Sequence, residues 1–391
     1  MTLLAPGLVP TVEPRAALAA AGAVVIDLRS PGEFAEDHLP GAHNVPLFDD
    51  AQRAIVGTLY ARESPDAALA EARRLVRSHI EGLVADVARI ARWSPPAVDL
   101  AAQLDRWTEG GIRALESSLP AAALAELPER PVVLHCWRGG LRSRSVTSFV
   151  RALGLERAVA LEGGYRGYRE WVRRGIEAWS PPRSFVLRGW TGVGKSLVLR
   201  EIERLRPGWT LDLEELAGHR GSILGMVGLD PCSQKTFETR LFARLARGFS
   251  GPCVVEGESR KVGNTVLPEP VWRAIDAGTA LELVAERERR VEVLTTDYLA
   301  RPANRAEIAA QLPFLEQRLG STKFAGVLTG MLARGEDRAL VELLLERYYD
   351  PLYRSSEKGR TYEQRFDATD PRQAAECIVG WIEARLVGSA P

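Results

Sequence analysis

Two short apolar runs in this chain end in glycine-rich loops, and each loop leads into a segment with helical periodicity. PVVLHC (131–136) precedes WRGG and the helical segment SRSVTSFVRALGL (143–155). SFVLRG (184–189) precedes WTGVG and the helical segment SLVLREIERL (196–205). A strand, a glycine loop and a helix in this order form the repeating unit of parallel α/β sheets. The chain is therefore predicted to be an α/β protein with one such sheet around each loop.

The remaining segments divide on either side of SPPR (180–183), the best candidate for a linker. Before it, the runs at 24–30 and 158–161 predict further strands, and residues 50–130 predict an insertion of several helices with a break at 94–96. After it, we expect strands at 210–213, 253–259 and 280–285, and mainly helices from about residue 286 onward. The predicted domains are 1–179 and 180–391.

The composition bears on two questions, the cellular compartment of the protein and the way it could bind a polyanion. Its 391 residues contain 51 Lys+Arg and 51 Asp+Glu, so nucleic acid must be held by a local basic patch rather than by net charge. Four cysteines lie far apart with no C-x-x-C spacing, which argues against a disulfide framework or a zinc site. With no signal peptide or membrane span in the pattern, we expect a cytoplasmic protein without membrane contact.

The loop after PVVLHC carries a candidate catalytic cysteine. Cys136 lies at the carboxyl end of a predicted strand, where α/β proteins bind ligands. The glycines let backbone N–H groups turn inward, and the next helix adds its positive N-terminus, so the loop can stabilise a thiolate and hold an anion. A reactive thiol that attacks an anionic donor is favoured over a buried structural cysteine. The predicted anion loop comprises Arg138, Gly139, Gly140, Arg142 and Ser143.

The second loop fits the phosphate-binding pattern G-x-x-x-x-G-K-S in the strand and helix context that the pattern requires. Backbone N–H groups would hold two linked phosphates, Lys195 would neutralise them, and Ser196 could ligate Mg²⁺. The predicted diphosphate site comprises Gly189, Gly192, Gly194, Lys195 and Ser196. Glu256 and Glu258 supply carboxylates at a later strand end, but ATP hydrolysis does not follow from this pattern.

Two enzyme classes use a cysteine loop of this kind. His135 through Arg142 fits H-C-x₅-R, the pattern of a cysteine phosphatase. VVIDLRSPGEFAEDHLPGAHNVP (24–46), however, strongly resembles the rhodanese signature, and rhodaneses carry sulfur or selenium on the loop cysteine. Within that resemblance Asp27, Arg29 and Glu33 are expected to build the fold through ion pairs and caps. The insertion at 50–130 departs from a minimal rhodanese and argues against a free-standing sulfurtransferase.

The whole chain resembles the bacterial tRNA 2-selenouridine synthase family. The resemblance rests on DLRSPGEF, VGTLY, HCWRGGLRS, GWTGVGKS, HRGSILG, PCSQKTFE and EGESRKVGN, in this order. It implies a rhodanese-like domain followed by a P-loop domain, acting on 2-thiouridine at wobble position 34 of tRNA. It further implies that geranyl diphosphate modifies the sulfur, that selenophosphate supplies selenium through Cys136, and that no cofactor is tightly bound.

Other polar residues of the quoted blocks are candidates for substrate contact, with structural caps and ion pairs as the equal alternative. These are His219, Arg220, Ser222, Gln234, Glu258 and Arg260. For tRNA, the runs at 165–174 and 287–290 supply arginines, and the first also supplies aromatics that could stack on bases. A solvated helix face is the alternative for both runs.

Three functions remain open from the residues alone. The first is the tRNA 2-selenouridine synthase, and the second is an ATP-dependent sulfurtransferase of the rhodanese type. The third is a nucleotide-dependent binding protein whose cysteine loop is inactive. The cysteine phosphatase is a distant fourth, since only one pattern supports it.

Overall fold

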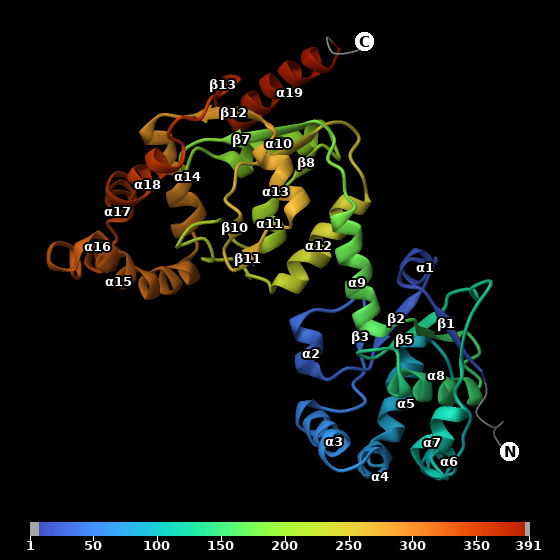
Figure 1. The fold of residues 1–391 in the computed structure, drawn as a ribbon. Coiled ribbons are helices and arrows are strands. Elements are labelled where there is room, and N and C mark those ends of the chain that lie inside the picture. The colour runs from blue at the N-terminus through green and yellow to red at the C-terminus, as the bar shows by residue number, and fades with distance from the viewer. Residues whose placement is uncertain (1–7, 388–391) are drawn as a thin grey trace. The chain divides into compact units, whose positions relative to one another are not determined.

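The computed structural model describes residues 8–387, apart from the side chains at positions 321, 322 and 356 (Figure 1). The chain divides into two compact units, the first ending at Arg174 and the second beginning at Gly175. This division falls within helix α9 (Gly164–Glu177), a few residues before the linker candidate at 180–183. Each unit contains a parallel sheet with helices between its strands, which confirms the predicted α/β class.

The first unit is built on a parallel sheet that has six strands in the described residues, in the order β3-β2-β5-β6-β1-β4. The strands are β1 (Val9–Val12), β2 (Val24–Asp27), β3 (His43–Asn44), β4 (Ala121–Ala123), β5 (Val132–His135) and β6 (Ala158–Leu161). β5 lies between β2 and β6, with Leu134 opposite Ile26 and Ala160. Every residue of β5 and β6 is buried, as expected for parallel strands covered on both faces.

Helices of the first unit fall into two groups. Those of the sheet crossovers are α1 (Pro14–Ala19), α2 (Pro31–Glu36), α8 (Leu141–Ala152) and α9. The predicted insertion forms α3 (Asp50–Arg62), α4 (Pro65–Arg77), α5 (Ile80–Ala91), α6 (Leu100–Trp107) and α7 (Gly111–Ser117). Asp49, Ser64 and Asp99 begin α3, α4 and α6 by accepting hydrogen bonds from backbone N–H groups of the first turn. Three of the five insertion helices therefore begin at a side-chain cap, and α5 and α7 do not.

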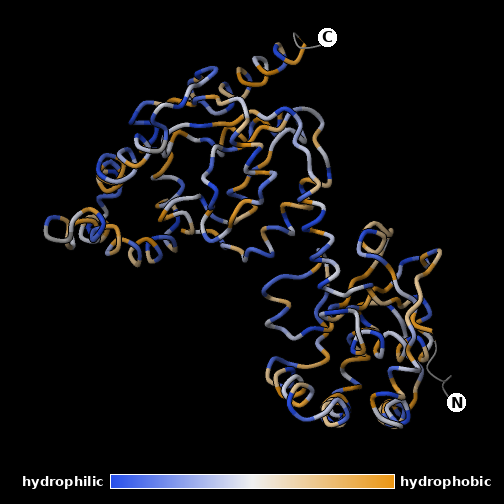
Figure 2. The backbone as a smooth tube through the Cα atoms, viewed as in Figure 1, coloured by the Kyte–Doolittle hydropathy of each residue, from blue (hydrophilic) through white to orange (hydrophobic). Residues whose placement is uncertain are grey.

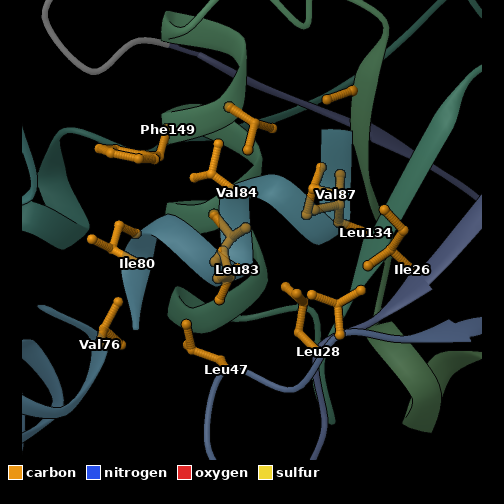
Figure 3. Packing of buried hydrophobic residues seen from close by; sticks show 14 of the residues in the cluster. Ile26, Leu28, Leu47, Val76, Ile80, Leu83, Val84, Val87, Leu134 and Phe149 are labelled. Atoms are coloured by element: carbon orange, nitrogen blue, oxygen red, sulfur yellow. The ribbon is translucent and has the colours of Figure 1, made fainter. Parts of the chain in front are cut away.

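Helices of the insertion join the core of the sheet, and α5 contributes the most residues. Leu83, Val84 and Val87 of α5 pack into the same buried cluster as Ile26 and Leu134 of the central strands (Figure 3). Figure 2 shows the corresponding hydrophobic runs along the strands. Burial of these side chains anchors the insertion to the sheet that carries Cys136.

A buried ion pair lies beneath the cysteine loop. Arg29 donates to Asp27 through Nε at 3.0 Å and Nη2 at 2.6 Å, and through Nη2 to the Asp37 carbonyl at 2.7 Å. The Arg29 guanidinium also lies 3.7 Å from the centroid of the Tyr165 ring, and Tyr165 donates to Asp37 at 2.7 Å. Glu33 forms a capping box with Ser30 at the start of α2. These contacts confirm the structural roles predicted for Asp27, Arg29 and Glu33.

The second unit has a parallel sheet of five strands in its described part, in the order β13-β12-β7-β9-β8. These are β7 (Ser184–Arg188), β8 (Thr210–Leu211), β9 (Cys253–Glu256), β12 (Thr279–Val284) and β13 (Gln364–Asp367). A short antiparallel ribbon joins β10 (Lys261–Val262) and β11 (Thr265–Val266). The central strand β7, whose residues are all buried, leads into the phosphate-binding pattern.

Helices of the second unit fall into two groups, one that precedes β12 in the chain and one that follows it (Figure 1). The first group is α10 (Lys195–Leu205), α11 (Leu213–Ala217), α12 (Gln234–Ala246) and α13 (Glu269–Asp276). The second is α14 (Arg287–Leu299), α15 (Pro302–Phe324), α16 (Val327–Arg334), α17 (Asp337–Leu344), the π-helix η1 (Leu345–Tyr349), α18 (Asp350–Ser356) and α19 (Pro371–Val387). Within residues 8–387, no helix has the length and apolarity needed to cross a membrane.

Strands β1, β4 and β13 were not expected from the sequence. β4 consists of three alanines, a residue type that favours helices, and lies at the sheet edge paired with β1. β13 interrupts the region predicted to be helical and pairs with β12. Backbone pairing to a neighbouring strand overrides the weak local preference in these short segments.

We predict that Arg29→Met lowers the free energy of unfolding by about 3–5 kcal/mol, because Asp27 is left as an uncompensated buried charge. Urea unfolding followed by circular dichroism measures this change. The control is Arg74→Met, which removes an exposed pair with Glu71 and should leave the unfolding midpoint almost unchanged. Equal effects of the two substitutions would contradict the role assigned to the buried pair.

Candidate functional site

The cysteine loop leaves the carboxyl end of a central strand. Cys136 follows β5 directly, and residues 136–140 turn into α8. Gly139 has a φ of +63°, and a Cβ atom there would lie 2.8 Å from the Leu161 carbonyl oxygen and 2.8 Å from the Gly164 nitrogen. Position 139 therefore requires glycine both for its backbone conformation and for lack of space.

The start of α9 packs against this loop from the other side. Gly164 has a φ of +56°, and a Cβ atom there would collide with the Gly139 nitrogen and the Cys136 carbonyl oxygen. The Tyr165 N–H donates to the Cys136 carbonyl at 2.9 Å, and the Arg166 N–H donates to the Trp137 carbonyl at 2.9 Å. Two glycines placed back to back thus let the first turn of α9 hold the backbone of the cysteine loop.

The thiol of Cys136 lies in a cationic cradle. Its Sγ is 3.3 Å from the Ser143 hydroxyl, on the first turn of α8, and Ser143 also donates to the Gly140 carbonyl at 3.3 Å. Arg138 and Arg142 form no ion pair within residues 8–387, so their charges are available to an anion. Together with the N-terminus of α8, these groups suit an anionic ligand beside Cys136.

His135 does not belong to the reactive group. It is fully buried, with Nε2 3.6 Å from Asp27 Oδ2, and burial lowers the pKa of its imidazole to about 4. The side chain is therefore neutral at physiological pH and forms part of the buried layer below the loop. The sequence fits the cysteine phosphatase pattern, but the histidine of that pattern, His135, is buried beside Asp27.

A pocket of about 600 Å³ opens beside the cysteine loop. Its walls come from α3, α4, α5, α6, α7 and α8, and Cys136, Arg138 and Arg142 supply polar groups to its lining. Apolar side chains line most of it, among them Val76, Ile80 and Phe149, which Figure 3 also shows. The predicted anion loop thus borders a large apolar chamber.

In the second unit, the phosphate-binding pattern forms a glycine loop between β7 and α10. Gly189, Gly192 and Gly194 have φ values of +152°, +81° and +89°, which a side chain would strain. Lys195 donates through Nζ to the Gly189 carbonyl at 3.2 Å, and Ser196 donates to Glu214 Oε2 at 2.8 Å. The loop therefore has the glycine conformations of the predicted phosphate-binding pattern, with Lys195 and Ser196 at the start of α10.

Buried carboxylates gather at the same edge of the sheet. Glu256 ends β9, and its Oε2 accepts from the backbone N–H groups of Leu213 at 3.1 Å and Glu214 at 3.5 Å. Asp212 and Glu258 border the same pocket of about 670 Å³, together with Lys195. Oε1 of Glu256 and Oδ2 of Asp212 are buried without a hydrogen-bond partner. Negative charge therefore exceeds positive charge close to the loop.

This crowding changes the acidity of the carboxyl groups. Burial, followed by the charge of Glu258, raises the pKa of Glu214 to about 7. Burial also raises the pKa of Asp212 to about 6, and it raises the pKa of Glu256 well above its ordinary value. Lys195 opposes the shift at Glu214 and Glu256. Part of the cluster therefore holds protons near neutral pH while the pocket is empty.

Comparison with known proteins decides the family. The model of the tRNA 2-selenouridine synthase AAA domain matches residues 182–385, and a rhodanese-like domain model matches residues 13–77. A tRNA 2-selenouridine synthase of Cupriavidus pinatubonensis is 31% identical over 93% of this chain and 95% of its own length. One of Chromohalobacter salexigens is 30% identical over 87% and 89%. The chain belongs to the tRNA 2-selenouridine synthase family.

The two domain matches lie in the two units, and the rhodanese-like match ends before the cysteine loop. The rhodanese-like match covers β2 and the buried Asp27–Arg29 pair and extends to the end of α4. The AAA-domain match begins just before β7 and extends into α19, so it contains the whole glycine loop. The order of a rhodanese-like domain followed by a P-loop domain is thereby confirmed.

Some of the other predicted substrate contacts border the pocket beside Lys195, and others lie outside it. Arg220, Ser222 and Glu258 border the pocket. His219 accepts from the Gly221 N–H at 3.1 Å and does not border it. Gln234 bridges to the backbone of Val266 at 3.0 and 2.7 Å, and Arg260 pairs with Glu269 at 2.8 Å, so both make structural contacts.

Several pocket residues of this synthase-family chain were not identified from its sequence. Asp212 and Glu214 directly follow β8, and carboxylates at the carboxyl end of a parallel strand were the signal available. Tyr353 accepts from the Gly189 N–H at 2.7 Å, although it lies 164 positions further along the chain. No local pattern could reveal a contact between segments so far apart.

The two basic runs are less available than predicted. Tyr165 and Tyr168 are each 1% exposed, so the interpretation that these rings stack on bases is wrong. In the run at 287–290, each arginine has a carboxylate partner: Arg287 pairs with Glu346, Arg289 with Glu292 and Arg290 with Asp350. The rings of Tyr165 and Tyr168 in the first run are packed in the core. The three arginines of the second run form ion pairs.

The carboxylate cluster predicts a specific pH dependence of stability. Between its ordinary pKa of 4.5 and its folded value of about 7, Glu214 keeps a proton that the unfolded chain has lost. Stability should therefore fall as pH rises through this window, by up to roughly 3 kcal/mol from Glu214. Glu214→Gln should flatten this fall in urea unfolding between pH 4.5 and 8.

The matched control is Glu376→Gln on the exposed surface of α19, which should keep the pH profile of the unsubstituted protein. If Glu214→Gln shows that same profile, the protonated carboxyl group is not at Glu214. Both proteins are compared without added phosphate or divalent cations, because a ligand would change the charge of the pocket.

Proposed function

We propose that the protein converts 2-thiouridine at position 34 of tRNA into 2-selenouridine. The observation that carries the proposal is the presence of two anion-binding loops in one chain of this family, one with a thiol and one with a lysine. Relatives named tRNA 2-selenouridine synthase match most of the chain. Two loops with different chemistry suit two donors, selenophosphate and geranyl diphosphate.

The P-loop pocket is proposed to bind the diphosphate of the geranyl donor. Lys195 and the backbone of the glycine loop would neutralise the leaving diphosphate while the sulfur of 2-thiouridine attacks the geranyl carbon. Residues 8–387 contain no group of three His, Cys, Asp or Glu side chains arranged to hold a metal ion. A Mg²⁺ ion would instead take ligands from the diphosphate and Ser196, with a carboxylate such as Glu214 nearby.

The cysteine loop is proposed to receive selenophosphate. Arg138 and Arg142 would bind its phosphate oxygens, and the inward N–H groups would hold the anion against Cys136. Among the cysteines that the structure describes, the proposal favours Cys136 because it begins a glycine loop at a strand end. Cys253 begins the buried strand β9, where burial raises the pKa of its thiol to about 12, and has no such surroundings.

Geranylation makes the exchange of sulfur for selenium chemically reasonable. The selenium of selenophosphate adds to C2 of the S-geranyl base, the C2–S bond breaks, and geranyl thiolate leaves. Water then attacks phosphorus and the Se–P bond breaks: the hydroxyl group leaves as part of phosphate and the remaining proton goes to N3, so the product is neutral 2-selenouridine. Selenium enters and sulfur leaves at the same oxidation level, and the exchange therefore needs neither an oxidant nor a reductant.

We predict that substitutions in the two loops stop different steps. A 2-thiouridine anticodon stem-loop is incubated with geranyl diphosphate and then selenophosphate, and mass spectrometry identifies the wobble nucleoside. Lys195→Ala should reduce geranylation about 100-fold or more, yet it should still selenate a stem-loop that already carries the geranyl group. Cys136→Ala should accumulate the geranyl product and form no 2-selenouridine.

Controls are Lys261→Ala and Cys377→Ala, which change an exposed lysine and an exposed cysteine and should leave both steps intact. Normal geranylation by Lys195→Ala would remove the P-loop from the first step. No change of the nucleoside by the unsubstituted protein, combined with ATP consumption, would favour the sulfurtransferase alternative.

A further inference from the structure

The apolar pocket of the first unit has no role in the fold that accounts for its size. α3 contributes no buried residue to the core, and it exposes Ile55 at 49% and Tyr60 at 57%. Yet Val56 and Tyr60 of this helix line the pocket. A helix that has no fully buried residue, and whose Val56 packs only partly buried against the core, walls an apolar chamber of about 600 Å³ and is arranged to face a ligand.

The lining divides into an apolar interior and a cationic end. Leu69 and Ala72 of α4, Leu104 and Trp107 of α6, and Leu141 and Phe149 of α8 form the interior. At the other end lie the Cys136 thiol and the guanidinium groups of Arg138 and Arg142, which have no carboxylate partner among residues 8–387. A fitting ligand has a long apolar chain joined to a polar head that reacts at Cys136.

The P-loop pocket has a different character. Charged groups crowd around its phosphate-binding end, including Lys195, Arg188, Asp212, Glu214 and Glu258. That end suits the diphosphate of a prenyl donor, but an apolar chain gains little from contact with buried charges. The apolar chamber of the first unit is the better place for a chain that has lost its diphosphate.

We infer that this pocket binds the prenyl chain on the sulfur of the modified wobble nucleotide, and so brings C2 of the base to the selenium held at Cys136. The inference rests on the proposed function and adds the recognition element for its second step. The chamber selects S-prenylated tRNA over 2-thiouridine tRNA, because the unmodified base has no chain to bury. The geranyl thiolate then leaves from within this chamber.

The test measures binding as a function of chain length, without any catalytic step. Anticodon stem-loops carrying S-methyl-, S-dimethylallyl- or S-geranyl-2-thiouridine are titrated into the full-length protein, and Kd is measured by fluorescence anisotropy. We expect the S-geranyl stem-loop to bind at least roughly tenfold more tightly than the S-methyl stem-loop, with the five-carbon chain between them.

Ala72→Trp fills the pocket from α4, and the ratio of the two Kd values should fall to near one. The matched control is Ala70→Trp, on the same helix but exposed and outside the pocket lining, which should keep the ratio of the unsubstituted protein. Circular dichroism verifies folding. If Ala72→Trp is unfolded, Val56→Trp on α3 fills the pocket from a helix that has no fully buried residue.

The outcomes separate this inference from the function on which it rests. A chain-length ratio near one in the unsubstituted protein, or an unchanged ratio in the folded pocket variant, would overturn it. Geranyl diphosphate binding that is lost in Ala72→Trp and kept in Lys195→Ala would assign the pocket to the donor and also overturn it. Tight S-geranyl binding without selenation by selenophosphate would overturn the proposed function and leave the pocket assignment in place.

Discussion

The buried pair of Asp27 and Arg29 is the interaction on which the first unit depends. It joins the end of β2 to the Asp37 carbonyl, and Arg29 also lies against the ring of Tyr165. Tyr165 belongs to the turn of α9 whose N–H groups hold the cysteine loop. A charge pair far from solvent thus fixes the helix that shapes the reactive loop, and the cost of burying it is offset by several hydrogen bonds.

Both candidate sites have the same backbone arrangement. In each unit a central strand leads into a loop with glycines at positive φ values, and a helix starts immediately after it. What differs is the group added to the cradle: a thiol in one, and a lysine with a hydroxyl in the other. The same α/β arrangement therefore provides one nucleophilic site and one electrostatic site.

The parts of the structure that depend on local pattern were predictable from the sequence. Runs of β-branched residues and the glycines predicted the two loops with their strands and helices. The rhodanese-like motif predicted the structural roles of Asp27 and Arg29. Contacts between distant segments were not predictable. Tyr353 at the glycine loop and the apolar pocket walled by six helices depend on segments far apart in the chain. The aromatics at 165 and 168 were misjudged because alternating aromatics and arginines suit both a base-stacking surface and a helix with one buried face.

The back-to-back glycines at 139 and 164 limit which amino-acid substitutions this chain can accept at their contact. In an ordinary core contact, a larger side chain on one segment can be accommodated by a smaller one on its partner. Here both partners already have the smallest possible side chain, and each approaches the backbone of the other. No second substitution at the contact can restore the lost space, so a defect at either position has no local suppressor. Revertants of such a defect should regain glycine itself.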